Sequence, residues 1–291
     1  MNQLKYYYFA NSIFFNEYFS ASNYSKKKIH PTGSIGLVPT MGSLHAGHAS
    51  LIHEAAKENN VVIVSIFINP TQFDDPDDLK KYPRNLDSDI KTIKSISEKI
   101  LIYVPKPIDI YENSIVSSSY DFGVISEIME AKHRRGHFNG VATVVEKLLV
   151  LFSPDRAYFG EKDFQQLQIV KLLVKQKKIK TKIIGCPILR RKNGLAMSSR
   201  NKLLTNEEIN LASFIFEQLK LAKSLWKNKS ANEIIRKIKN SFFKKNHFKL
   251  DYFDIRYENT LLNAKKKSHK KVRGFIAAKF CEIRLIDNLS F

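Results

Sequence analysis

Short apolar runs alternate with segments of helical spacing in the first two thirds of the chain. Ile35–Val38 is an apolar run that ends at Pro39, and the apolar positions from Ala46 to Asn59 follow one face of a helix. The next run, Val61–Phe67, is almost wholly apolar and β-branched, which is typical of a strand buried on both faces of a parallel sheet. The pattern predicts strand, loop, helix and strand in succession.

The same alternation continues through the middle of the chain. Periodicity predicts helices at Asp87–Ile96, Val141–Phe152 and Gln165–Gln176, and strands at Ile100–Val104 and Arg156–Phe159. Strands that alternate with helices favour an α/β fold with a Rossmann-like, doubly wound parallel sheet.

The composition changes near Arg190, where a run of loop residues begins. A Lys-rich helical region, Asn206–Asn246, follows, and then two alternating segments, Tyr252–Tyr257 and Phe275–Leu285, with a basic turn between them. We therefore expect two domains: a Rossmann-like ligand-binding domain at residues 1–188 and a smaller α+β lid domain at residues 189–291.

Composition narrows the class of protein. The 43% hydrophobic content of the 291 residues supplies a core and excludes wholesale disorder. The formal charge of +20 attracts anions, but Lys clusters among Asn, Ile, Phe and Tyr are also what a compositional bias would produce, so charge alone selects no partner. No apolar run reaches the roughly 18 residues that span a bilayer.

Cysteine usage and the N-terminus bear on the compartment. Cys186 and Cys281 form no CxxC pair, and free thiols in a reducing compartment are expected. Residues 6–15 only faintly imitate a secretion signal, because three tyrosines and Asn11 interrupt the apolar segment. We expect a cytoplasmic protein with no membrane partner.

The sequence from Pro39 to His48 carries the clearest chemistry. It contains an H-x-G-H motif, His45 to His48, where a predicted strand ends and a helix begins, and open α/β sheets bind ligands at that position. The unpaired N–H groups of a helix N-terminus suit a phosphate, and Gly47 lacks the Cβ that would obstruct it. The chain has no G-x-x-x-x-G-K-[ST] loop and no G-x-G-x-x-G turn.

The two histidines also allow other interpretations. They could be inert loop residues, or two ligands of a metal site completed by His53, Asp74 or His137. None of these candidates has a recognisable metal-ligand spacing.

Six motifs in order resemble one family, the pantothenate synthetases, also called pantoate–β-alanine ligases. They cover residues 33–205, with a weaker match at Arg284–Asn288, and they read VPTMGSLHAGH (38–48), NPTQF (69–73), YPR (82–84), GHFNGVAT (136–143), YFGEKDFQQ (158–166) and GLAMSSRN (194–201). The H-x-G-H alone would indicate only the wider superfamily of nucleotidyltransferases and class I aminoacyl-tRNA synthetases.

The resemblance implies a two-step reaction. Pantoate attacks the α-phosphate of ATP to give pantoyl-adenylate and pyrophosphate, and the amine of β-alanine then displaces AMP. It implies His48, His45 and Lys162 as catalytic residues, with His48 matching the proton donor of the family. It also implies Mg²⁺ carried by ATP, with Asp89 as a weak ligand candidate, and a homodimer formed through the N-terminal domain.

The resemblance also implies the binding residues. Gln72 and Gln166 match the glutamines that hold pantoate, and Asn69 is an additional substrate contact. The implied ATP contacts lie in three segments, with Leu189 at the adenine: Met41, Gly42, Ser43, Leu44, His45, Ala46, Gly47 and His48; Gly160, Glu161, Lys162 and Asp163; Met197, Ser198, Ser199 and Arg200.

The chain departs from the family pattern after the last strong motif. Arg191 and Asn193 stand where the family usually carries acids, and Tyr257–Asn259 replaces an Asp-containing turn. These departures put lid movement in doubt but leave the site residues in place. Two other functions remain open: a nucleotidyltransferase with a different acid substrate, and an RNA-binding protein on the same fold, although no specific nucleic-acid partner is expected.

Overall fold

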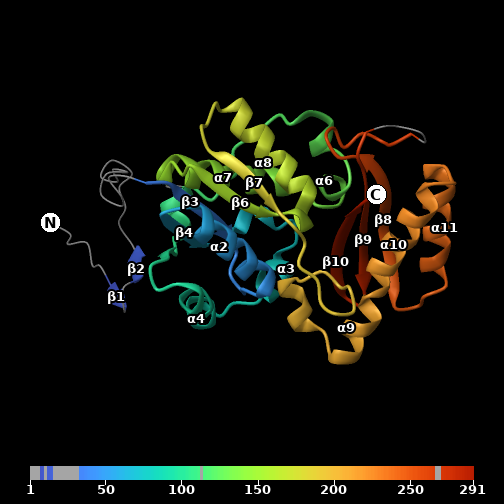
Figure 1. Cartoon of the computed structure of the whole chain (residues 1–291), viewed down its shortest axis with the longest axis horizontal. Helices are drawn as coiled ribbons and strands as arrows, with labels where there is room; N and C mark the ends of the chain where they lie inside the picture. Colours follow the sequence, from blue (N-terminus) through green and yellow to red (C-terminus); the bar gives the residue numbers. More distant parts are fainter. Residues whose placement is uncertain (1–6, 10–11, 16–32, 112–113, 266–269) are drawn as a thin grey trace.

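The computed structural model describes residues 7–9, 12–15, 33–111, 114–265 and 270–291 (Figure 1). Two sheets organise this part of the chain, a larger one from the first two thirds of the sequence and a smaller one from the last third. Of the segment that faintly imitates a signal, residues 7–9 and 12–15 form two short edge strands, and the rest lies outside the described residues.

The larger sheet has seven strands in the order β1-β2-β5-β4-β3-β6-β7. Every pairing is parallel except that of β1 with β2 at one edge. The strands are β1 (Tyr7–Phe9), β2 (Ser12–Phe15), β3 (Ile35–Thr40), β4 (Val61–Ile66), β5 (Leu101–Tyr103), β6 (Arg156–Gly160) and β7 (Lys182–Cys186). The predicted doubly wound parallel sheet is confirmed.

Helices cover both faces of this sheet because the strands are apolar on both sides. On β4, Ile63 joins the apolar cluster under α7 and α8, whereas Val62 and Val64 join the cluster under α2 and α4. The helices are α2 (Ala46–Glu58), α3 (Pro76–Lys81), α4 (Leu86–Ile96), α5 (Pro107–Tyr111), α6 (Glu130–His133), α7 (His137–Phe152) and α8 (Phe164–Gln176). Short 3₁₀ turns are η2 (Pro70–Gln72), η3 (Gly123–Ser126), η4 (Glu161–Asp163) and η5 (Ser199–Leu203).

The strand order places a crevice beyond the carboxyl ends of the neighbouring strands β3 and β6. From β3 the chain builds outward to β4 and β5 on one side, and then returns to place β6 and β7 on the other side. The carboxyl ends of β3 and β6 therefore border a topological switch point, the position at which open α/β sheets bind ligands.

The smaller sheet is an antiparallel meander in the order β10-β9-β8, covered by three helices. Its elements are α9 (Asn206–Ala212), α10 (Phe214–Trp226), α11 (Ala231–Phe243), β8 (Phe248–Tyr257), β9 (Val272–Phe280) and β10 (Ile283–Ser290). The predicted helical region is thus three helices. Thr205 and Ser230 begin α9 and α11 with capping boxes.

One predicted strand is wrong in its extent. The segment Phe275–Leu285 is not a single strand, because the chain reverses at Cys281, whose φ is 50°, and pairs β9 with β10. The apolar alternation continues on both sides of this tight turn, so periodicity alone does not show the reversal. The predicted basic turn before β9 lies partly outside the described residues.

The two sheets contact each other near the crevice. Leu261 and Phe275 belong to the same apolar cluster as α7 and α8, and the rings of Phe164 and Phe275 lie 5.9 Å apart. The division at residues 188 and 189 stays a prediction. Among the helices in the described ranges, none is long and apolar enough to cross a membrane.

Candidate active site

A cavity of about 230 Å³ opens at the switch point. Its walls come from the ends of β3 and β6, the start of α2, the turn η2, helices α6 to α8, η5 and strand β10. The groups that face the cavity include cations, carboxylates and imidazoles as well as apolar side chains. Such a wall suits a ligand that is both charged and partly apolar.

The loop after β3 is held from behind by Asp89. Its two carboxylate oxygens accept the N–H groups of Ser43, at 2.8 Å, and Leu44, at 2.6 Å. Ser43 has a φ of 52°, a left-handed conformation that a non-glycine residue adopts only when the surroundings hold it. Asp89 is 2% exposed and does not line the cavity, so its visible role is to anchor this loop.

His45 begins helix α2 as its N-cap. Its Nδ1 accepts the N–H of Gly47 at 3.0 Å, so the neutral ring carries its proton on Nε2. Burial, together with the positive charges of His48, Lys162 and Lys202, lowers the pKa of His45 to about 3. At neutral pH this ring is an uncharged hydrogen-bond donor.

His48 lies one helical turn further on, with its ring 4.1 Å from that of His45. Burial and the charges of Lys162 and Lys202 lower the pKa of His48 to about 4. Its Nδ1 is buried and has no partner among the described residues. A buried polar atom of this kind is costly unless a ligand satisfies it.

Asn69 and Gln72 lie at the two ends of η2, on the next wall. Asn69 is 1% exposed, and its amide donates to Gly140 O on α7 at 3.0 Å and accepts the N–H of Thr71. A Cβ on Gly140 would lie 2.4 Å from Thr71 O, so only glycine allows this close approach of helix and turn. Asn69 therefore fixes the turn that carries Gln72.

A buried histidine holds the backbone of Gln72 from the other side. His137 Nδ1 donates to Gln72 O at 2.8 Å, and Arg134 donates to the same carbonyl at 3.2 Å. Burial first, and then the charge of Arg134, lower the pKa of His137 to about 3, so the ring is neutral. His137, considered above as a metal ligand, is instead part of the scaffold under Gln72.

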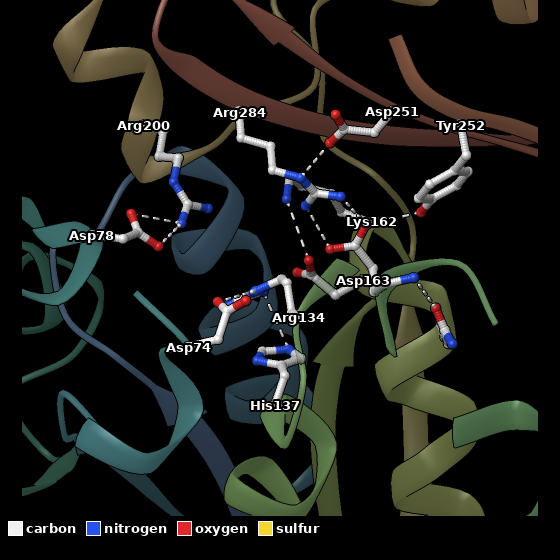
Figure 2. A network of polar contacts seen from close by, with 12 residues as sticks. Asp74, Asp78, Arg134, His137, Lys162, Asp163, Arg200, Asp251, Tyr252 and Arg284 are labelled. Atoms are coloured by element: carbon white, nitrogen blue, oxygen red, sulfur yellow. Dashed lines mark hydrogen bonds and ion pairs between the residues drawn. The ribbon is translucent and has the colours of Figure 1, made fainter. Parts of the chain in front are cut away.

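Two cations approach the cavity from opposite sides. Lys162 lies in η4 just after β6, and its ammonium contacts Asp163 Oδ1 at 3.4 Å. Arg200 lies in η5 and donates to both carboxylate oxygens of Asp78 on α3, at 2.8 and 3.1 Å. Lys162, Asp163 and Arg200 line the cavity, and Figure 2 shows these three residues together with Asp78.

The loop of η5 rests on the loop that begins α2. Ser199 Oγ donates to Ser43 O at 3.0 Å, and Lys202 Nζ donates to Ser43 Oγ at 3.1 Å. Ser198 caps η5 through a capping box with Asn201. The segment 197–200, which the resemblance implies as part of the ATP site, is therefore in contact with the histidine loop.

Sequence reasoning missed an ion network on the wall that α6 and β10 form. Glu130, Arg134 and Arg284 all line the cavity, and Arg284 on β10 pairs with Glu130 on α6. Figure 2 shows Arg284 with its partner Asp251. Arg284 stands in the weakly matched motif 284–288, which was the only available signal. Glu130 and Arg134 lie just before a strong motif and carry no local pattern.

Most of the predicted site residues meet at this cavity. The lining includes Met41, His45, Gly47, His48, Asn69, Gln72, Gly160, Lys162, Asp163, Gln166, Leu189, Met197, Ser198, Ser199 and Arg200. Of the remaining candidates, Gly42, Ser43, Leu44, Ala46 and Glu161 are not part of that lining. The N–H groups of Ser43 and Leu44 are already bonded to Asp89.

The metal interpretation of the histidine pair gains no support. Within the described ranges, no group of three or more His, Cys, Asp or Glu side chains could hold a metal ion. His45 uses its Nδ1 within helix α2, which leaves Nε2–H as a donor and not a metal ligand.

An open parallel sheet with a histidine loop, a lysine and an arginine at its switch point defines a class, the nucleotide-binding α/β enzymes. The family model of pantoate-beta-alanine ligase matches residues 15–290. The chain therefore belongs to the pantoate-beta-alanine ligase family, and it is a ligase.

Relatives and solved structures agree with this assignment. The chain is 50% identical to the pantothenate synthetase of Flavobacterium psychrophilum over 96% of this chain and 99% of the relative. It is 48% identical to that of Christiangramia forsetii over 88% of this chain and 91% of the relative.

The similar solved structures cover nearly the whole chain as well. The crystal structure of pantothenate synthetase from Thermus thermophilus aligns with a TM-score of 0.83 at 34% identity, over 92% of this chain and 95% of that chain. Pantoate-beta-alanine ligase from Francisella tularensis, complexed with beta-gamma ATP and beta-alanine, aligns with a TM-score of 0.72 at 41% identity, over 88% and 89%.

Proposed function

We propose that this ligase condenses pantoate with β-alanine at the expense of ATP, through a pantoyl-adenylate intermediate, and releases AMP and pyrophosphate. The observation that carries the proposal is the convergence of two neutral histidines, Lys162 and the Ser198–Arg200 loop on one cavity at the switch point. The structure of the Francisella tularensis relative, complexed with beta-gamma ATP and beta-alanine, supports both ligands.

In the first step the carboxylate of pantoate attacks the α-phosphorus and the bond to pyrophosphate breaks. Negative charge grows on the phosphate oxygens, and positioned donors and cations lower the barrier. His45 Nε2–H, His48 and the Lys162 ammonium provide these donors. The low pKa values of both rings make hydrogen bonding their starting role, and bound phosphate would raise those values toward proton donation.

The pantoate subsite lies between η2 and α8. Gln72 and Gln166 line the cavity and offer carboxamides that satisfy hydroxyl and carboxylate groups without a competing nucleophile. Asn69 contributes through the turn it holds, because its amide is bonded to Gly140 and Thr71. The ATP subsite lies on the other side, with Leu189 at the adenine and Met197, Ser198, Ser199 and Arg200 at the phosphates.

In the second step the neutral amine of β-alanine attacks the acyl carbon of the adenylate. The new C–N bond replaces the C–O bond to the phosphate, and AMP leaves with that electron pair.

We propose that Mg²⁺ arrives on the ATP phosphates, where it neutralises part of the triphosphate charge. Both Asp89 oxygens are committed to backbone N–H groups, which argues against Asp89 as its ligand. Asp163, which lines the cavity beside Lys162, is the carboxylate better placed to approach a metal ion on the phosphates.

We also propose a homodimer in the cytoplasm, which the family resemblance supports. Sedimentation equilibrium at assay concentrations checks the assembly, and a fully active monomer would contradict it. No specific nucleic-acid partner is proposed for the +20 charge.

The decisive experiment is exchange of labelled pyrophosphate into ATP with Mg²⁺ and pantoate and without β-alanine. Exchange that requires pantoate, followed by formation of pantothenate and AMP once β-alanine is added, supports the proposal. A panel of other 2-hydroxy acids serves as the control, and exchange with one of them in place of pantoate would favour a nucleotidyltransferase with a different acid. Binding of RNA that falls steeply with salt, with no exchange, would favour the RNA-binding alternative.

A further inference from the structure

The side chain of Asn288 joins the C-terminal sheet to the backbone on both sides of the Lys162 α-carbon. Asn288 lies on β10 and is 1% exposed. Its Nδ2 donates to Glu161 O and to Lys162 O, both at 2.9 Å. One amide therefore holds the two carbonyls that flank the residue proposed to bind the phosphate.

The orientation of this amide is itself fixed. Arg273 on β9 donates from Nη1 to Asn288 Oδ1 at 2.5 Å, so the oxygen of the amide points to Arg273 and its nitrogen points to η4. Arg273 is 6% exposed, and it also bonds Glu161 Oε2 at 3.2 Å and Glu258 Oε1 at 3.0 Å. Three charge-assisted bonds on one guanidinium leave it little freedom to rotate.

The neighbouring residue ties the same strand to the segment before η5. Asp287 forms a two-bonded ion pair with Arg190, with N–O distances of 2.6 and 2.9 Å, and Arg190 also donates to Asn288 O at 3.0 Å. The position of Asn288 is thus set by groups on β9 and on the segment that follows β7.

The Lys162 side chain, in contrast, is held weakly. Its ammonium contact with Asp163 is long, at 3.4 Å, and the two side chains are 20% and 44% exposed. Exposed pairs of this kind contribute about 0–1 kcal/mol. The backbone of η4, not the ion pair, is what determines where the ammonium can reach.

We propose that Asn288 is a positioning residue for Lys162 and that the C-terminal sheet thereby controls adenylation. The inference rests on the proposed function of Lys162 at the phosphates. Removing the amide withdraws one hydrogen bond from each of the two carbonyls of η4, which loosens the turn and moves the ammonium away from the phosphate. Displacement by about 1 Å can cost on the order of a hundredfold in rate.

The test is a double-mutant cycle in the pantoate-dependent pyrophosphate exchange reaction. The variants are Lys162→Ala, Asn288→Asp and the two combined; Asn288→Asp keeps the side-chain shape but removes both donated bonds. We expect each single variant to lose about ten- to a hundredfold in kcat, and the combined variant to be no slower than Lys162→Ala.

Asn193→Ala is the matched control. Asn193 also donates an amide bond to a backbone carbonyl of the C-terminal part, Ile209 O at 3.0 Å, but it is not part of the cavity lining. It should keep kcat within about threefold of the unsubstituted enzyme. The loss of unfolding free energy should be about 1–3 kcal/mol, because the variant also removes the side-chain bonds to Asn210 Oδ1 and from Leu195 N–H. Urea unfolding identifies any variant that fails to fold, and Asn288→Ser then replaces Asn288→Asp in the cycle.

The possible outcomes separate the two proposals. If Lys162→Ala has full activity, both the role of Lys162 and the positioning inference fall. If Lys162→Ala is slow but Asn288→Asp is not, only the positioning inference falls. If the losses multiply in the combined variant, Asn288 acts independently of Lys162, and the inference is likewise overturned.

Discussion

Arg284 on β10 donates to both carboxylate oxygens of Glu130 on α6, at 2.7 and 2.8 Å. The same guanidinium bonds Asp251 at 2.7 Å, and Tyr252 donates to Glu130 at 2.9 Å. Burial alone would raise the pKa of Glu130, but the hydrogen bonds and charge of Arg284 outweigh it and lower that pKa to about 2. The network joins the small sheet to the cavity wall of the large one.

This network predicts an asymmetric response to substitution. Arg284→Met leaves the Glu130 carboxylate, whose side chain is 9% exposed, without its guanidinium, and we expect a loss of about 3–5 kcal/mol in unfolding free energy. Adding Glu130→Gln removes the uncompensated charge and should recover part of the loss. Urea unfolding measures both, and equal losses in the single and double variants would contradict the argument.

The local parts of this molecule could be predicted from sequence, and the long-range parts could not. Buried strands and amphipathic helices leave periodic signals, and His45, Lys162 and Arg200 lie inside contiguous motifs. Glu130 and Arg284 are 154 positions apart, and no spacing in the sequence shows that folding brings them together.

The errors have related physical causes. The turn at Cys281 was missed because apolar alternation continues from β9 into β10, and only the positive φ shows the reversal. The sequence indicates that Asp89 is an acid near the site. Its two oxygens accept the N–H groups of Ser43 and Leu44 because α4 packs against the loop, and the sequence does not show that packing.

Three histidines with lowered pKa values, the buried His137 and the partly buried His45 and His48, predict loss of stability in mild acid. His45, His48 and His137 have pKa values of about 3, 4 and 3 in the folded chain, below the ordinary value of 6.5. Between pH 6.5 and the folded-state pKa values the unfolded chain binds more protons than the folded chain. The contribution of the three neutral rings to the free energy of unfolding is therefore fully present above about pH 6.5 and is lost as pH falls. Each histidine costs about 1.4 kcal/mol per pH unit in that range.

Urea unfolding from pH 7.5 to 5 checks this slope. His137→Gln should flatten it by about 1.4 kcal/mol per unit. Glu130 titrates in a lower window, between its ordinary pKa and about 2, and does not confuse the comparison. An identical slope in His137→Gln would show that this ring is not neutral in the folded chain.

Gly47→Ala should separate activity from stability. A Cβ there would lie 2.8 Å from Cε1 and 2.9 Å from Nδ1 of the His45 ring, so the ring must move. We expect a loss of about ten- to a hundredfold in pyrophosphate exchange with little change in thermal stability. The gain of about 1 kcal/mol from the helix propensity of alanine offsets the loss of about 1 kcal/mol from the disturbed His45 cap. His53→Ala, on the same helix, is the control. Full activity in Gly47→Ala would mean that the position of His45 is unimportant.

Asp89→Ala tests whether that carboxylate anchors the loop or binds Mg²⁺. Without it, the buried N–H groups of Ser43 and Leu44 have no acceptor, and the strained φ of Ser43 is no longer supported. We expect a loss of about 3 kcal/mol or more in stability and a slow exchange reaction that extra Mg²⁺ does not restore. Recovery of the rate at high Mg²⁺ would assign Asp89 to the metal.

The ion pair of Arg200 with Asp78 predicts a competition with ATP. If Arg200 binds the triphosphate as proposed, it must first release Asp78. The pair, with side chains 28% and 35% exposed, is worth about 1 kcal/mol at most. Asp78→Asn should therefore tighten ATP binding by up to about fivefold, because 1 kcal/mol corresponds to that factor. Calorimetric titration of ATP measures it, with Asp77→Asn as a control that removes the same charge from the exposed neighbouring position.

Since Arg200 and Asp78 are both partly exposed, the gain in ATP affinity should shrink as salt rises toward about 1 M, where the screening length is about 3 Å. Equal gains in ATP affinity for Asp77→Asn and Asp78→Asn would mean that the lost negative charge alone causes the gain. The Arg200–Asp78 pair would then not compete with ATP.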